Sequence, residues 1–210
     1  MFPELENIRR EVERITRQAS ETNWHQAPPG KWSCALIFEH LLLTYTGTTK
    51  RIANVMKRGR PLGSKATLQD RVRTLWVTKL GLMPSGRIAP PNMVPKSGLA
   101  LDSLRRFYDA LVAMDATLAD AERRFGSHVK LLDHPFLGPL NAKEWRQFHR
   151  THARHHLKQA AERIREQTSA DLIANSFTGT SPDTIAKPTV QPTWRPKNTH
   201  QERRQKEFRG

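Results

Sequence analysis

Residues 145–159, which read WRQFHRTHARHHLKQ, decide the fold of this 210-residue chain. They lie within a run from 141 to 164 that contains no proline or glycine. Apolar side chains recur along the run at steps of three to four residues, which is the spacing of a buried helix face: Trp145, Phe148, Leu157, Ala160 and Ile164. The run therefore predicts a long amphipathic α-helix.

The same stretch holds four of the nine histidines, namely His149, His152, His155 and His156. His152 and His156 are four residues apart, so a helix places both imidazoles on one face, one turn above the other. Two imidazoles at this spacing can bind one metal ion. The alternative is a solvated histidine face on a basic protein. His149 lies near the same face, whereas His155 is turned about 100° from His156 and is expected to point elsewhere.

A second histidine of interest is His40, which interrupts the mostly apolar run CALIFEHLLLTY at 34–45. Ser33 is a suitable N-cap, so a deeply buried helix is expected from Cys34 to about Lys57. A histidine in such a helix is either a hydrogen-bonded core residue or a metal ligand. Glu39 beside it is a surface neighbour or a group that supports a ligand.

Two more long helices are expected, at 3–21 and at 101–125, the latter ended by Gly126. Trp24 and Trp32 bracket the first loop and are interpreted as lids on the core or as one wall of a pocket. Between 59 and 99 lies a long Pro-rich insert. It contains a short helix at about 67–80, whose apolar positions are Leu68, Val72, Leu75, Trp76 and Leu80. Residues 127–140 are interpreted as a linker with His134 as a loop anchor, and Asn141 as the cap of the fourth long helix.

The composition and the apolar periodicity of the chain change after residue 167. Residues 1–167 are predicted to form one domain, and residues 168–210 a disordered basic tail, because the tail lacks apolar periodicity and contains four prolines. The formal net charge is +15, and most of it belongs to the first 167 residues. Such a charge implies attraction to polyanions or to an acidic ligand.

Compartment and membrane topology follow from composition. The single cysteine, Cys34, excludes an intrachain disulfide framework and fits a reducing compartment. No apolar run of about 18 residues exists, so no transmembrane helix is expected. We therefore expect a cytoplasmic protein with no membrane partner.

Four long helices joined by long connections predict an all-α fold, a four-helix bundle with a Pro-rich insert and a disordered C-terminal tail. Bundle cores build metal sites from side chains on facing helices. His40 from the second long helix, with His152 and His156 from the fourth, would hold Zn²⁺, Ni²⁺, Co²⁺ or Mn²⁺ and leave positions open for water or substrate.

The segments WSCALIFEHLLLTY and HPFLGPLNAKEWRQFHRTHARHHLKQ resemble the DinB-like superfamily of four-helix bundles, within a bacterial branch of unassigned function. The resemblance covers residues 1–165 and implies a metal held by one histidine of helix two and an HxxxH pair of helix four. On this chain these are His40, His152 and His156. Characterised relatives include bacillithiol-using S-transferases and a mycothiol-dependent maleylpyruvate isomerase. The insert, the basicity and the tail depart from the family pattern.

The resemblance implies a metal- and thiol-dependent transferase that acts on small electrophiles, with a low-molecular-weight thiol as cosubstrate. Glu39 and His149 are the candidate supporting groups. A metal-dependent hydrolase and a non-enzymatic protein that binds nucleic acid or another polyanion remain alternatives. Among partners we expect a small-molecule substrate. A homodimer is left open, and nucleic acid is the less favoured partner because the basic residues are spread along the chain.

Overall fold

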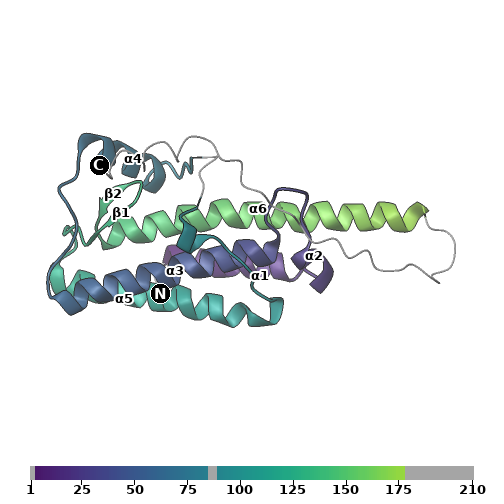
Figure 1. Ribbon diagram of the computed structural model, residues 1–210, viewed down its shortest axis with the longest axis horizontal. Helices are drawn as coiled ribbons and strands as arrows, with labels where there is room; N and C mark the ends of the chain where they lie inside the picture. The colour runs from purple at the N-terminus through teal and green to yellow at the C-terminus, as the bar shows by residue number, and fades with distance from the viewer. Residues whose placement is uncertain (1–2, 85–88, 178–210) are drawn as a thin grey trace, which may run out of the picture. The chain divides into compact units, whose positions relative to one another are not determined.

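The computed structural model describes residues 3–84 and 89–177 and shows a predominantly helical fold (Figure 1). Four long helices form the bundle: α1 (Pro3–Thr16), α3 (Cys34–Arg58), α5 (Leu104–Phe125) and α6 (Ala142–Phe177). Met1–Ser176 form one compact unit. The prediction of an all-α bundle is confirmed, with the addition of one small β-hairpin.

The ends of α3 follow from its sequence. The Ser33 side chain accepts a hydrogen bond from the Leu36 backbone N–H and so caps the first turn. Gly59 ends the helix with a φ of 67°, in the left-handed region, and its N–H donates to the Met56 carbonyl. The helix begins and ends almost where the sequence predicts, and this fixes His40 in its second turn.

The first helix is shorter than expected. It ends at Thr16, and a separate short helix, α2 (Glu21–His25), follows. Ser20 and Asn23 form a capping box that starts α2. The predicted single helix over 3–21 is therefore wrong in its last turn, because Ser20 begins a new helix. Trp24 of α2 is fully buried and donates from Nε1 to the Leu99 carbonyl at 2.7 Å.

The insert contains the expected short helix, α4 (Leu68–Thr78), which begins with a capping box of Thr67 and Asp70. Two 3-10 turns follow, η1 (Pro91–Met93) and η2 (Leu101–Ser103). The apolar face that predicts α4 is exposed, whereas Thr74, Val77 and Thr78 are buried. The helix is thus where the sequence places it, with the side that carries the two threonines and Val77 against the protein.

Residues 127–140, expected to be a linker, contain an antiparallel hairpin of β1 (Leu132–His134) and β2 (Gly138–Leu140). The expectation of loop alone is therefore wrong. His134 Nδ1 accepts from the backbone N–H groups of Phe136 and Leu137 and so closes the turn. Its interpretation as a loop anchor is confirmed. Strands of three residues are too short for an alternating pattern to reveal them.

Asn141 caps α6 as expected, in a reciprocal pair with Glu144: each side chain accepts from the other's backbone N–H. The helix runs to Phe177, past the predicted boundary at 167. The expectation of disorder is wrong for 168–177, where neither proline nor glycine interrupts the helix. The remainder of the predicted tail, 178–210, lies outside the described residues.

One ion network is buried between α5 and α6. Arg146, with a side chain only 4% exposed, donates from Nε to Asp115 at 2.9 Å and from Nη1 to Glu122 at 2.7 Å. A guanidinium away from water is stable only with such partners. The network therefore ties α6 to α5 in the first turns of α6, before the histidine cluster.

No helix in the described part of the chain is long and apolar enough to cross a membrane.

Candidate metal centre

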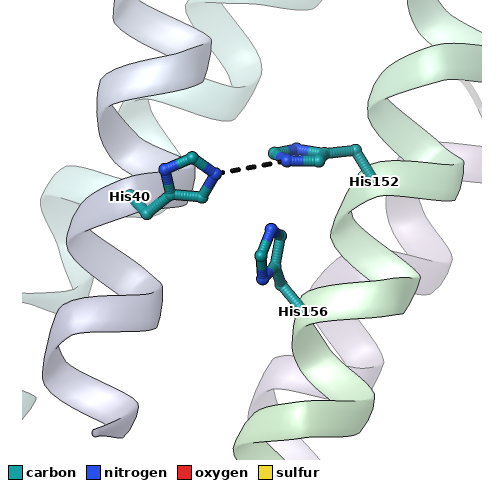
Figure 2. A group of neighbouring side chains, drawn as sticks. All are labelled: His40, His152 and His156. Atoms are coloured by element: carbon teal, nitrogen blue, oxygen red, sulfur yellow. Dashed lines mark hydrogen bonds between the residues drawn. The ribbon is translucent and has the colours of Figure 1, made fainter. Parts of the chain in front are cut away.

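Three imidazoles converge between α3 and α6: His40 from α3, and His152 and His156 from successive turns of α6 (Figure 2). One ring nitrogen from each lies within 4.8 Å of the others. The Nε2 atoms of His40 and His152 are 3.2 Å apart. The expected convergence of these three residues is confirmed, and the cluster can hold a metal ion.

The hydrogen bonds around the cluster assign two of the tautomers. His40 Nδ1 lies 2.7 Å from the Met93 carbonyl, which only accepts, so Nδ1 carries the proton. His156 Nδ1 lies 2.8 Å from Gln159 Oε1, while Gln159 Nε2 faces His155 Nε2 at 3.3 Å, so the His156 Nδ1 also donates. The Nε2 atoms of His40 and His156 therefore keep lone pairs available to a cation.

When no cation is bound, few hydrogen-bond donors are available to these Nε2 lone pairs. His152 carries one ring proton and can offer it from Nε2 to only one neighbour. A metal ion accepts all three lone pairs at once. Two donors held about 2.0–2.1 Å from one tetrahedral ion lie roughly 3.3–3.4 Å apart, close to the 3.2 Å observed between His40 and His152. The donor set thus fits a divalent ion.

Burial keeps these rings neutral. It lowers the pKa of His152 well below its usual value, helped by the neighbouring His156 and His40. It likewise lowers the pKa of His156 to about 3 and lowers the pKa of His40. Neutral imidazole is the form that binds metal, so the site can bind a cation at neutral pH. Three nitrogen donors favour Zn²⁺, Ni²⁺ or Co²⁺ over Mg²⁺ or Ca²⁺, which prefer oxygen.

The segment 93–99, called the strap below, holds His40 from outside α3. One carboxylate oxygen of Glu39 accepts from the backbone N–H groups of Lys96, Ser97 and Gly98, at 2.9, 3.0 and 2.6 Å. At the far end, the Leu99 N–H donates to the Ala35 carbonyl. Glu39 therefore holds the strap, whose Met93 carbonyl contacts His40.

Gly98 lets the strap lie directly on α3. Its φ is 79°, and a Cβ there would come 2.8 Å from the Ala35 Cβ. At the other end the Met93 side chain covers Gly47, where a Cβ would lie 2.5 Å from Met93 Cε. A larger residue at Gly98 would lift the strap from α3, whereas at Gly47 the flexible end of the Met93 side chain can move aside.

His149, the other candidate supporting group, is fully buried one turn before His152. Its Nε2 lies 3.0 Å from Thr48 Oγ1, and its ring stacks on Trp145. The structure therefore gives it a packing contact between α3 and α6. His155 lies on the other side of His156 and is bridged to it by Gln159.

Trp32 stands beside the cluster, with its ring centroid 5.0 Å from His40 and 6.2 Å from His156. It is half-buried, as is His156, whereas His40 and His152 are buried. Of the two interpretations of Trp32, the wall of a site fits this position. Trp32 and His156 are therefore the more exposed members of this group.

The sequence did not lead us to expect two groups that contact the histidine cluster. The Met93 carbonyl is a backbone group 53 residues from His40, and no sequence pattern marks it. Gln159 had a signal, because it lies three residues after His156 and four after His155, the spacings at which helix side chains meet.

Acid is expected to destabilise the metal-free protein. Burial lowers the pKa of His149 and His156 to about 3 and that of His134 to about 4. Below pH 6.5 the unfolded chain takes up protons that the folded chain excludes, so stability falls as pH falls, by up to about 1.4 kcal/mol per pH unit and group. Thermal unfolding from pH 7.5 to 4.5 measures this loss.

The slope should flatten in His149→Gln, which removes one buried imidazole. A melting temperature that does not change with pH in this range would contradict neutral, buried imidazoles.

Comparison with known proteins adds one match. A family model described as "Protein of unknown function (DUF1569)" matches residues 1–163, which include α1, α3, α5, the first part of α6 and all three histidines. No curated protein and no solved structure matches the chain.

Proposed function

The chain belongs to the DUF1569 family, whose function is unknown, and for this member we propose a metal- and thiol-dependent transferase acting on small electrophiles. The observation that carries the proposal is the cluster of His40, His152 and His156, which is neutral and is bordered by the half-buried ring of Trp32. We further propose that the family is a branch of the DinB-like superfamily, whose metal pattern these residues match.

In this proposal His40, His152 and His156 hold Zn²⁺, Ni²⁺, Co²⁺ or Mn²⁺. When bound, the ion supplies a Lewis acid that lowers a thiol's pKa and gives thiolate at neutral pH. Three protein ligands leave a position open for the sulfur. Met93 and Gln159 keep two ligands in the binding tautomer, and Trp32 provides an apolar wall against which an electrophile can stack.

The chemical step is a substitution. The thiol sulfur forms a bond to an electrophilic carbon, and the bond from that carbon to its leaving group breaks. The leaving group departs with the bonding pair, and the thiol proton passes to solvent. Glu39 is hydrogen-bonded to the strap, and His149 is hydrogen-bonded to Thr48. We therefore assign both residues a role in supporting the ligands and no direct part in this step.

Thiol transfer is expected to depend on the ion. Conjugation of a low-molecular-weight thiol to a haloaromatic or an epoxide should stop on addition of a chelator and return with Zn²⁺, Ni²⁺, Co²⁺ or Mn²⁺. His155→Ala should keep the activity, whereas His40→Ala should lose it. Ester hydrolysis without thiol transfer would favour the hydrolase, in which water takes the open position.

Glu39→Ala should weaken metal binding about 10- to 100-fold, since groups that orient metal ligands contribute this much. The change frees three strap N–H groups and releases the Met93 carbonyl from His40. Competition with a chromophoric chelator measures the affinity. Glu11→Ala, which removes a surface pair with Arg14, is the control. Equal affinities in both variants would show that the strap does not act on the site.

A further inference from the structure

α4 presents its apolar side to solvent. On the helix, Leu68 is 78% and Trp76 57% exposed, and Val72 and Leu75 are exposed with them. Leu80, 60% exposed, and Leu82 continue the exposed set beyond the end of α4 at Thr78. The side packed on the protein carries threonines, and Thr74 Oγ1 donates to the Leu137 carbonyl. Leaving a contiguous set of large apolar side chains in water is unfavourable, and such patches mark interaction surfaces.

Cations flank this face. Arg71 lies on α4, Lys79 is its C-cap, and Lys143 lies on the first turn of α6; all three are exposed. None of them forms an ion pair with another described residue. They line a cleft of about 260 Å³ along the flank of α4, where Lys130 is already paired with Glu144. The surface therefore combines an apolar strip with positive charges that form no ion pair with the acidic side chains in 3–84 and 89–177.

We propose that α4 docks this protein onto a membrane surface that contains anionic phospholipids. The helix would lie in the plane of the interface, with Leu68, Trp76 and Leu80 among the acyl chains. Arg71, Lys79 and Lys143 would meet lipid phosphates. An apolar face flanked by cations is the pattern of interfacial helices, and each Lys or Arg near an anionic leaflet adds about 1 kcal/mol.

The positive charge of the protein favours an anionic membrane, and not a second copy of the chain, as the partner of the α4 surface. The formal net charge is +15, and a second copy would bring the same cations to the interface. An anionic leaflet neutralises them. The expectation of no membrane partner came from the missing spanning segment. A helix that lies on the surface needs no such run, because only one face is buried in lipid. This inference is independent of the metal site.

Cosedimentation of the full chain with vesicles tests the proposal. Binding is expected to vesicles of phosphatidylcholine and phosphatidylglycerol in equal amounts, to weaken with salt, and to be absent with phosphatidylcholine alone. Trp76→Glu should lower vesicle affinity about tenfold or more, because a large side chain no longer enters the apolar layer. Leu80→Glu should act in the same direction.

Val112→Glu is the matched control, because Val112 on α5 is 51% exposed and lies outside the surface. It should bind like the wild type. Replacing Arg71, Lys79 and Lys143 by alanine should weaken binding more than replacing the exposed Lys50, Lys57 and Arg106. Circular dichroism confirms that each variant is folded.

Three results would overturn the proposal. One is the absence of binding to the anionic vesicles. Another is an equal loss of binding in Trp76→Glu and Val112→Glu. The third is a dimer seen by light scattering that Trp76→Glu disrupts while the wild type ignores vesicles, which would assign α4 to a second copy.

Discussion

His156→Ala is expected to lower the affinity for Zn²⁺, Ni²⁺ or Co²⁺ by about two orders of magnitude or more. Binding energies of structural zinc sites are of order 10–16 kcal/mol over four ligands, so one ligand accounts for a few kcal/mol. His156 donates its Nδ1 proton to Gln159, so its Nε2 keeps a lone pair that can bind a metal ion. Alanine removes this lone pair. Titration calorimetry of metal-stripped, untagged protein measures the change.

His155→Ala is the matched control, since it removes a neighbouring imidazole on the same helix. Its contact is to Gln159 Nε2, so its loss should change the affinity by less than about tenfold. Thermal unfolding of both metal-free variants checks that the bundle is intact. Equal losses of affinity in the two variants would show that the ion binds elsewhere.

The largest loss of stability is expected from Arg146→Ala. The change leaves the Asp115 carboxylate buried, with a side chain 9% exposed, and without its guanidinium. Removing one partner of a buried ion pair costs about 3–5 kcal/mol. Urea unfolding monitored by circular dichroism measures the free energy of unfolding.

Arg123→Ala is the control. Arg123 pairs with Asp120 on the same helix, with a side chain 72% exposed, and such surface pairs contribute at most about 1 kcal/mol. If Arg146→Ala costs no more than Arg123→Ala, the network does not hold α6 against α5.

The sequence was enough to predict the bundle and the cluster. Each ligand carried a local signal: His40 broke an apolar run, and His152 and His156 stood at the spacing of one helix turn. Two ligands on one helix need no tertiary information to be placed together. The third needed only the expectation that α3 and α6 face each other.

Other features depend on contacts that sequence patterns do not encode. The strap reaches His40 through a backbone carbonyl, and its three hydrogen bonds to Glu39 join residues 57 to 59 positions apart. The hairpin has strands too short to show a period. For α4, periodicity predicts a helix but not the side that faces the protein, because buried Thr74 and Thr78 bond to backbone carbonyls.

Anomalous diffraction from crystals grown with Zn²⁺ or Co²⁺, recorded on both sides of the metal absorption edge, tests the central claim most directly. The account predicts one strong peak per chain, about 2.0–2.2 Å from the Nε2 atoms of His40, His152 and His156. Full occupancy at another group of side chains, with these three imidazoles free of metal, would contradict it.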